Sequence, residues 1–387
     1  MKKICIITGS RAEYGLLYPL LKELAAFRDV KLQIVATGMH LAPKFGLTYR
    51  EIEADGFKIS AKIAFPLPDK AGTAVSIGKA ILATAPVLER LKPNVVVLLG
   101  DRFETFAAAT AAYTLKIPIA HLHGGEVTAG VFDEAFRHSV TKMSSLHFTS
   151  TEAYRRRVIQ LGENPTTVFN VGAIGLDNIR QADFITKEEL GSQMGVKLTG
   201  KLACVTFHPV MFEKAEPCAQ LKELFAALDK FPSLQVIFTL PNADIGATGI
   251  IAAIRAYARA NSSRVFAFKS LGQKRYLSLL KVSSVVIGNS SSGIIEAPSL
   301  CTPTVNIGAR QEGRVRPASV IDCPSKKRAI SAAIIKALSP SFAPALHKTN
   351  PYGDGRSAPR IARLLIRKTS TLRVKKTFFD FSGASRP

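Results

Sequence analysis

Short apolar runs alternate with longer amphipathic segments along the chain. The run Val95-Val96-Val97-Leu98-Leu99 is apolar at every position. A strand covered by helices on both faces has this continuous pattern, which indicates a parallel sheet. The first series predicts strands at Ile4–Thr8, Leu32–Thr37, Lys58–Ile63, Val95–Leu99, Ile117–Leu122, Leu146–Thr149 and Val168–Val171. The helices predicted between them are Gly15–Phe27, Thr73–Leu91, Phe103–Leu115 and Glu152–Leu161.

The pattern restarts after the polar stretch Asp183–Gly200. It predicts strands at Leu202–Phe207, Gln235–Leu240, Val265–Phe268, Val285–Ile287 and Thr304–Ile307, and helices at Ala219–Asp229, Ile250–Ala260 and Lys274–Lys281. Two successive β–α arrays predict an α/β fold of two Rossmann-type, doubly wound parallel-sheet domains around a cleft. We expect the first domain at residues 1–180 and the second at 181–356, with a C-terminal helix within about 357–387 packing back on the first.

Composition narrows the class of protein. A chain of 387 residues suits two domains, and 47% apolar residues are enough for a large core. No run reaches the roughly 18 apolar residues of a membrane span, and Ile4–Ile7 is too short for a signal peptide, so we expect a cytoplasmic protein without a membrane partner. The five cysteines are odd in number and widely spaced, with no C-x-x-C, which argues against a disulfide framework or a zinc site.

The charge is strongly positive, with 52 Lys and Arg against 29 Asp and Glu, a net +23. Such an excess suits a nucleic-acid partner or an anionic small molecule. The chain has no Trp and no recognisable nucleic-acid motif, and its densest basic runs are Arg155–Arg157 and Lys326–Arg328. Runs of this size are typical of solvated faces. We therefore expect no nucleic-acid partner, and nucleic-acid binding remains the alternative from another functional class.

Ligands of open parallel sheets bind beyond the carboxyl ends of the strands, so the residues that follow each strand are the candidates. The first strand runs into Thr8-Gly9-Ser10-Arg11-Ala12-Glu13, where small residues and Arg11 suit an anion. Neither a G-x-G-x-x-G nor a P-loop pattern is present. Val95–Leu99 is followed by Gly100-Asp101-Arg102, in which Asp101 suits catalysis and helix capping equally.

The densest group of titratable residues follows the next strand. His121-Leu122-His123-Gly124-Gly125-Glu126 closes it, and Asp133 comes shortly after. If both histidines lay in the strand, their side chains would point to the same face. Two histidines and a carboxylate could hold zinc, but an H-x-H pair alone is weak evidence, so we predict neither a metal nor a cofactor.

The second array offers a nucleotide site. Strands there are followed by His208, by Asn242 and by the loop Gly288-Asn289-Ser290-Ser291-Ser292-Gly293, with a helix expected from about Ile294. Serine hydroxyls, free amides and a helix N-terminus together suit a diphosphate. Glu296, one turn further, could accept hydrogen bonds from ribose hydroxyls. The loop after the next strand adds the cations Arg310 and Arg314.

In order along most of the chain, these motifs resemble those of the hydrolysing UDP-N-acetylglucosamine 2-epimerases of sialic-acid and legionaminic-acid synthesis. The resemblance is carried by Thr8–Gly15, Gly100–Glu104, His121–Glu126, Arg137–Lys142, His208–Val210, Gly288–Gly293 with Glu296, and Gly308–Arg314. It implies a GT-B-like pair of domains and a homo-oligomer, dimer or tetramer. It also implies a UDP-sugar substrate bound by Arg11, Arg102, His208, Asn242, Ser290, Ser291 and Glu296. The loop residues themselves add Ser292, Arg310 and Arg314 to the predicted nucleotide-binding set.

The implied reaction is anti elimination of UDP to a 2-acetamidoglycal, followed by syn addition of water. Its main form converts UDP-N-acetylglucosamine to N-acetylmannosamine and UDP in nonulosonic-acid synthesis. The catalytic candidates are Asp101, Glu126, Asp133 and His123, and the base among them stays open. Some members have Glu where this chain has His123, and the His-Gly-Gly-Glu form resembles the branch that acts on UDP- or GDP-linked 2,4-diacetamido-trideoxy sugars of the bacillosamine type. That substrate is the alternative, beside a glycosyltransferase or a non-hydrolysing epimerase.

Overall fold

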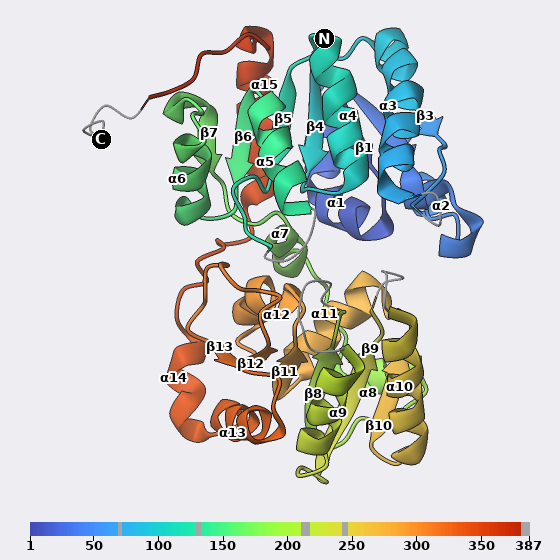
Figure 1. Cartoon of the computed structure of the whole chain (residues 1–387), viewed down its shortest axis with the longest axis vertical. Helices are drawn as coiled ribbons and strands as arrows, with labels where there is room; N and C mark the ends of the chain where they lie inside the picture. Colours follow the sequence, from blue (N-terminus) through green and yellow to red (C-terminus); the bar gives the residue numbers. More distant parts are fainter. Residues whose placement is uncertain (69–71, 129–132, 210–216, 242–246, 381–387) are drawn as a thin grey trace. The chain divides into compact units, whose positions relative to one another are not determined.

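The computed structural model describes residues 1–68, 72–128, 133–209, 217–241 and 247–380. The chain forms two compact units (Figure 1). The first comprises Met1–Glu126, Phe132–Asn178 and Gly355–Pro387, and the second comprises Val127–Val131 and Ile179–Asp354. The chain therefore enters the second unit briefly after Glu126, within the stretch expected in the first domain, and returns to the first unit at its C-terminal end.

The first unit is built on a seven-stranded parallel sheet with the order β3-β2-β1-β4-β5-β6-β7. The strands are β1 (Lys2–Thr8), β2 (Val30–Thr37), β3 (Ile59–Ile63), β4 (Val95–Leu99), β5 (Ile119–Leu122), β6 (Leu146–Thr149) and β7 (Val168–Asn170). The helices are α1 (Arg11–Ala25), α2 (Tyr49–Ala54), α3 (Gly72–Leu91), α4 (Phe103–Thr114), α5 (Asp133–Met143), α6 (Glu152–Gln160) and α15 (Ser357–Lys368), and α7 (Gly175–Arg180) leads into the second unit.

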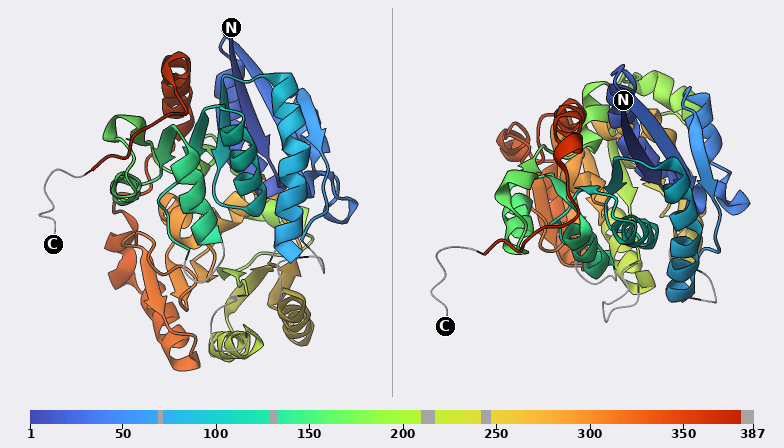
Figure 2. Two further views of the ribbon diagram at one scale, coloured as in Figure 1. Left: turned by 45° about the horizontal axis from the view of Figure 1, so that its top comes forward. Right: turned by 90° about the horizontal axis from the view of Figure 1, so that it is seen from above.

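Alternate residues of β1 enter two different cores. Ile4 and Ile6 pack with Leu20 of α1 and Ile361 of α15 on one face. Cys5 on the other face packs with helices α3, α4 and α5. Figures 1 and 2 show these two groups of helices on opposite faces of the sheet. This double coverage explains the continuous apolar runs of the strands.

The C-terminal helix α15 is fixed to the first unit at its start. The Asp177 carboxylate accepts hydrogen bonds from the backbone N–H groups of Ser357 and Ala358, at 2.9 and 2.8 Å. These are two of the amides that a helix N-terminus leaves without an intrahelical partner. The helix ends at Lys368, and residues after it continue along the first unit without further α-helix as far as they are described.

The second unit is built on a six-stranded parallel sheet with the order β10-β9-β8-β11-β12-β13. Its strands are β8 (Lys201–Thr206), β9 (Leu234–Thr239), β10 (Val265–Phe268), β11 (Val285–Gly288), β12 (Thr304–Ile307) and β13 (Val320–Cys323). Its helices are α8 (Lys187–Met194), α9 (Pro217–Leu228), α10 (Ala247–Ala260), α11 (Gly272–Val282), α12 (Ser292–Ile295), α13 (Lys327–Ala337) and α14 (Ala343–Leu346). Two parallel-sheet units confirm the predicted α/β fold class.

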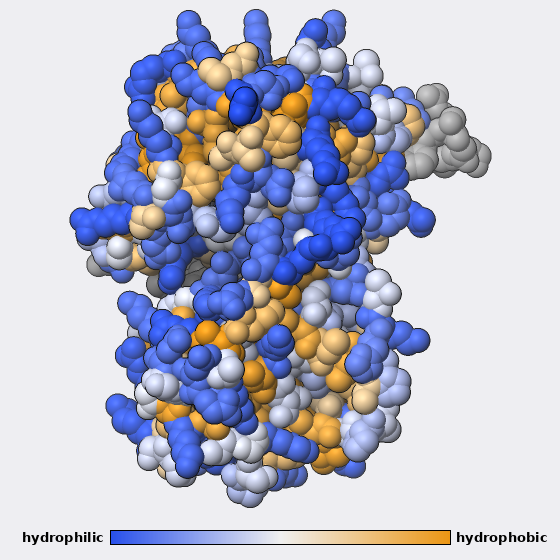
Figure 3. All heavy atoms as spheres, turned by 180° about the vertical axis from the view of Figure 1, so that it is seen from behind, coloured by the Kyte–Doolittle hydropathy of each residue, from blue (hydrophilic) through white to orange (hydrophobic). Residues whose placement is uncertain are grey.

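Hydrophilic side chains predominate on the face drawn in Figure 3, with apolar side chains between them. Within the described part of the chain, no single helix has the length and apolar character needed to cross a bilayer. One pair bent by 74°, Lys327–Ala337 with Pro340–Leu346, meets that criterion by length and composition alone.

Candidate active site

In each sheet the strand order reverses at one point, and such points are where open α/β sheets bind ligands. In the first unit the reversal lies between β1 and β4, and in the second between β8 and β11. The loops after these four strands hold Gly9–Ser10, Gly100–Arg102, Phe207–His208 and Asn289–Ser291. Most of the predicted site residues therefore follow strands at or next to these two positions.

Buried carboxylates surround Arg102 beyond β1 and β4. Arg102 binds the Glu104 carboxylate through Nε and Nη2, at 3.2 and 3.1 Å. Burial alone would lower the pKa of Arg102, but the charge of Glu104, with Glu13 and Asp133, raises it above its ordinary value. The guanidinium of Arg102 therefore stays charged in the loop where an anionic substrate is expected.

Glu13 is a second buried carboxyl group beside Arg102. Its side chain accepts a hydrogen bond from the Gly9 amide at 2.7 Å, while Ser10 caps helix α1 by accepting from the Glu13 amide at 3.3 Å. Burial raises the pKa of Glu13 to about 8, and the neighbouring Glu104 adds to the rise. Gly38 lies so close to Glu104 that a Cβ there would be 2.9 Å from its Oε1. Sequence reasoning did not assign a role to Glu13 or Glu104.

Arg137 of α5 collects the polar groups that follow β4 and β5. Its guanidinium forms an ion pair with Asp101, a second with Glu134, and a 2.7 Å hydrogen bond to the backbone carbonyl of Glu126. Asp101 precedes Arg102, the N-cap residue of α4, whose side chain makes no capping hydrogen bond. The Asp101 side chain is thus bound to a buried cation rather than capping α4.

Asp133 begins helix α5, and its carboxyl group interacts electrostatically with Asp101 and Arg102. Burial raises its pKa to about 6, and the charge of Asp101 adds to the rise, while Arg102 and Arg137 oppose it. A carboxyl group that titrates near neutral pH can take up or release a proton during a reaction. Asp133, one of the predicted catalytic residues, is such a carboxyl group.

His123 lies outside β5, in a backbone conformation that side chains seldom adopt, with φ of +65°. Its Nδ1 is 2.9 Å from Oε1 of Glu126, and its Nε2 accepts a 3.4 Å hydrogen bond from the Ile174 amide. Because Nε2 accepts, Nδ1 must carry the proton and donate to Glu126. The hydroxyl of Ser150 donates to the same Oε1 at 2.7 Å. His123 and Ser150 together orient the Glu126 carboxylate.

The two histidines of this segment do not share a face. His121 is fully buried in β5, where its Nε2 is 2.7 Å from the carbonyl oxygen of Gly100 and its Nδ1 is 3.2 Å from the Thr141 hydroxyl. Burial lowers its pKa to about 3. The condition for a same-face pair is not met, because β5 ends at Leu122, as predicted, and the chain turns at His123. Among the described residues, no three His, Cys, Asp or Glu side chains are grouped to hold a metal ion.

Arg11 is the most exposed of the predicted anion-binding residues in the first unit. It is the first residue of α1, and its Nε is 2.9 Å from Oε2 of Glu51, which is also half-exposed. Exposed pairs of this kind contribute little to stability. The contact to Glu51 therefore leaves Arg11 able to exchange its partner for a ligand anion.

In the second unit, Asn289 connects the loops after β8 and β11. Its side chain accepts from the His208 amide at 2.7 Å and donates to the His208 carbonyl at 2.9 Å. Gly288 has φ of +135°, and a Cβ at this position would overlap the carbonyl oxygen of Thr206. Only glycine therefore permits the close approach of the two strand ends.

Two buried polar atoms near Asn289 have no hydrogen-bond partner within the described part of the chain, Nδ1 of His208 and Oε1 of Gln311. Burial lowers the pKa of His208 to about 3, and Arg310 adds to the effect, so the ring is neutral. Arg310 and Gln311 both donate to the backbone carbonyl of Asn289, at 3.0 and 2.9 Å. Buried polar atoms normally have partners, so these two indicate a place where a polar ligand binds.

The serine loop differs from expectation in its helix. Helix α12 begins at Ser292 and ends at Ile295, and a 3₁₀ turn containing Pro298 follows it. The predicted helix is therefore a single turn that begins two residues earlier than expected, and its dipole is smaller than that of a longer helix. The Ser292 hydroxyl accepts a 2.8 Å hydrogen bond from Tyr276, and burial raises the pKa of Glu296, which Ser292 opposes by hydrogen bonding.

The remaining predicted residues are Arg314, Asn242, Ser290 and Ser291. The Arg314 guanidinium donates to the Val127 carbonyl at 3.2 Å and contacts the Thr128 hydroxyl at 3.4 Å, which explains why residues after Glu126 belong to the second unit. Asn242 lies outside the described residues. Ser290 and Ser291 form the loop that ends in α12, and the Ser290 hydroxyl accepts from the Ser292 amide at 3.4 Å.

Comparison with known proteins identifies the family. The model of the family described as UDP-N-acetylglucosamine 2-epimerase matches residues 22–366. A Campylobacter jejuni protein named GDP/UDP-N,N'-diacetylbacillosamine 2-epimerase (hydrolyzing) is 42% identical, covering 83% of this chain and 84% of its own. A Legionella pneumophila protein named UDP-N,N'-diacetylbacillosamine 2-epimerase (hydrolyzing) is 39% identical, covering 94% and 96%. The Escherichia coli polysialic acid biosynthesis protein P7 is also 39% identical, covering 91% and 90%.

Solved structures agree on the fold. The crystal structure of a putative UDP-N-acetylglucosamine 2-epimerase from Listeria monocytogenes has a TM-score of 0.80 at 19% identity, covering 98% of this chain and 99% of that one. The chain belongs to the hydrolysing UDP-N-acetylglucosamine 2-epimerase family, a class of GT-B-like enzymes that act on nucleotide sugars. The resemblance that the motifs predicted is thereby confirmed.

Proposed function

We propose that this enzyme hydrolyses a UDP-linked 2,4-diacetamido-2,4,6-trideoxyhexose of the bacillosamine type and inverts the sugar at C2. The observation that carries the proposal is the similarity, at 42% and 39% identity over most of the chain, to two proteins named for that substrate. The His-Gly-Gly-Glu sequence at His123–Glu126 supports it. The names of these relatives support a diacetamido sugar as the substrate better than UDP-N-acetylglucosamine, which the sequence analysis gave as the main expectation.

The proposed nucleotide site lies on the second unit. The unpartnered Nδ1 of His208 and Oε1 of Gln311 are buried polar atoms beside the switch point of the second sheet. The imidazole nitrogen can donate to a phosphate oxygen when it carries the ring proton, and the amide oxygen can accept from a ligand hydroxyl. Arg310 and the hydroxyls of Ser290 and Ser291 supply donors for a diphosphate. By the family resemblance, Glu296 and Asn242 complete the set, with Glu296 on the ribose.

The proposed chemistry belongs to the acidic groups of the first unit. UDP departs from C1 as a base removes the proton from C2, which gives a 2-acetamidoglycal; water then adds its OH to C1 and a proton to C2. The C2 hydrogen has no adjacent carbonyl, so departure of the diphosphate must lead and C1 gains positive charge. Carboxylates near the ring would stabilise that charge and exchange the proton, and Asp101, Glu126 and Asp133 are the candidates. His123, as a donor to Glu126, would position it.

Product analysis tests the proposal. The full chain is incubated in deuterated water with UDP-N,N'-diacetylbacillosamine, its GDP-linked form, or UDP-N-acetylglucosamine. We expect free UDP, the C2-inverted sugar and deuterium at C2, with kcat/KM at least tenfold higher for the UDP-diacetamido sugar. Retention of the C2 hydrogen would exclude elimination, and return of a UDP-linked product would identify a non-hydrolysing epimerase.

The similarity to the E. coli polysialic acid biosynthesis protein favours a second candidate, conversion of UDP-N-acetylglucosamine to N-acetylmannosamine. The same assay separates the two, because the enzyme would then prefer UDP-N-acetylglucosamine. In either case we infer a cytoplasmic homo-oligomer whose product enters nonulosonic-acid synthesis, of the legionaminic type for the first candidate. Size-exclusion chromatography with light scattering would measure the oligomeric state.

A further inference from the structure

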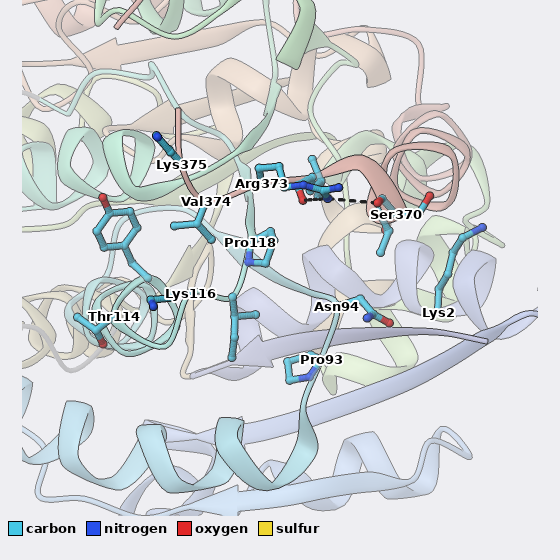
Figure 4. Close-up of a pocket in the computed structure, with 14 residues that line it drawn as sticks. Lys2, Pro93, Asn94, Thr114, Lys116, Pro118, Ser370, Arg373, Val374 and Lys375 are labelled. Carbon is cyan, nitrogen blue, oxygen red and sulfur yellow. Dashed lines mark hydrogen bonds between the residues drawn. The ribbon is translucent and has the colours of Figure 1, made fainter. Parts of the chain in front are cut away.

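A cavity of about 990 Å³ opens in the first unit, away from the candidate active site. Its walls are the start of β1, the segments that lead into β4 and β5, the end of α4, and the chain that follows α15 (Figure 4). These are the amino ends of parallel strands, whereas the catalytic candidates follow their carboxyl ends. The seven residues of β1, at about 3.3 Å each, separate the two edges by roughly 20 Å.

The cavity is lined by cations without any acid. Lys2, Lys116, Arg373 and Lys375 lie on its walls, and no Asp or Glu is among the lining residues. Lys2 has a 3.4 Å contact to Asp29, whose side chain is more than half exposed. Within the part of the chain that the structure describes, Lys116 and Lys375 form no ion pair. Nη1 of Arg373 donates to the carbonyl of Leu372 at 2.9 Å, and Figure 4 shows Arg373 beside Ser370 and Val374 at the cavity.

Apolar groups make up the rest of the lining. Pro93, Ile117, Pro118 and Val374 line it together with Leu372, which is buried in the core of the unit. Tyr113 is also among the lining residues and is 43% exposed. An inorganic anion would leave these surfaces in contact with water. A flat apolar body would cover them and stack on Tyr113.

We propose that this cavity binds a phosphorylated small molecule with a flat aromatic or heterocyclic body, the chemical class to which nucleotides belong. Lys116, Lys375 and Arg373 bind the phosphate, and Tyr113 with the apolar wall binds the ring. The cavity volume matches that of small-molecule sites. A bound ligand joins the segment after α15 to the strands of the sheet. The binding site is therefore separate from the substrate site and independent of the reaction proposed above.

Calorimetric titration of the full chain with 1-naphthyl phosphate tests this site, and variants of the lining residues separate binding in the cavity from binding at the nucleotide site of the enzyme. We expect one-to-one binding that is at least tenfold tighter than for inorganic phosphate. The variant Lys116→Gln/Lys375→Gln should weaken it at least tenfold. The matched control Lys58→Gln/Lys79→Gln removes two exposed lysines of the same unit and should change it less than twofold. Tyr113→Ala should weaken naphthyl phosphate but not inorganic phosphate.

Three results would overturn the proposal. One is the absence of saturable naphthyl phosphate binding to the full chain. Another is an equal loss of affinity in the control variant, which would assign the effect to net charge. The third is equal affinity for inorganic and naphthyl phosphate. Because the side chains of Lys116 and Lys375 form no hydrogen bond or ion pair among the described residues, and all four substituted lysines are exposed, both double variants should keep the melting temperature and the epimerase activity of the parent chain.

Discussion

Arg137 is the residue that organises the acidic groups of the first unit. It is 2% exposed and is bound by Asp101, Glu134 and the Glu126 carbonyl. Burial by itself would lower the pKa of Arg137, but the carboxylates of Asp101, Glu126 and Glu134 raise it above its ordinary value overall. A buried cation with these partners holds Asp101 in one position, and our proposed reaction needs a carboxylate held in this way beside the sugar ring.

Asp101→Asn should reduce kcat at least 100-fold while changing the dissociation constant for UDP less than threefold, because the lost carboxylate acts on the sugar in our proposal. Steady-state kinetics and UDP calorimetry measure the two quantities. Glu134→Gln also loses a contact to Arg137 but is not a catalytic candidate. It serves as the control, and its kcat should fall less than tenfold. Full activity of Asp101→Asn would reduce Asp101 to a structural role.

Asp133 should make stability depend on pH. Its folded-state pKa of about 6 lies above the ordinary value of 3.8, so the folded state binds the proton more tightly than the unfolded state. The stabilisation is present below about pH 4 and is lost as pH rises through 6. Asp133→Asn cannot ionise and should lose less thermal stability than the parent between pH 4.5 and 7.5. If the melting temperatures of the parent and of Asp133→Asn changed by the same amount between pH 4.5 and 7.5, the pH dependence could not be assigned to Asp133.

At the scale of elements, the strand order within each sheet places the functional loops of that sheet beside its own switch point. The apolar runs predicted the strands of both arrays to within about two residues, except β13, whose half-exposed sequence Val320–Cys323 gives no continuous apolar run. Helix α12 differed most from expectation, since Pro298 stops it after one turn. Ser150 was missed, although its position directly after β6 was a usable signal.

Gly288→Ala tests the junction of β8 and β11. The added Cβ would overlap the Thr206 carbonyl, and φ of +135° suits only glycine, so we expect a loss of about 2–4 kcal/mol in the free energy of unfolding and weaker UDP binding. Gly78→Ala in α3 is the control, because nothing lies within 4 Å of its Cβ, and a helical alanine should stabilise by up to about 1 kcal/mol. Urea denaturation measures both. Tolerance of Ala at position 288 would mean that the strand ends can separate.

At the scale of the whole molecule, the first unit is completed by the end of the chain. Ile361 and Leu365 of α15 are buried in the core that begins with β1. Asp177 holds the start of this helix from 180 residues away in the sequence. The net charge of +23 also belongs to this scale. Arg102 and Arg310 belong to the proposed substrate site. A further cluster of lysine and arginine side chains lines the cavity at the opposite edge of the first sheet.

Asp177→Ala should cost about 1–2 kcal/mol of stability, because it leaves two helix amides without an acceptor. Hydrogen exchange should accelerate in residues 357–368. Thr186→Ala is the control: it removes the capping box of α8 and should accelerate exchange in residues 187–194 instead. If exchange in 357–368 stayed at the parent rate, α15 would be held by packing alone.

The sequence by itself determined the class of fold and the family. Continuous apolar runs, strand-end motifs and their order need only local information, because each residue's neighbours along the chain decide them. Tertiary structure alone decided that Arg137 binds Asp101, that His121 and His123 face different surroundings, and that Asn289 joins the loops after β8 and β11. These depend on which distant segments meet, and on how burial shifts each proton equilibrium, and no local pattern encodes either.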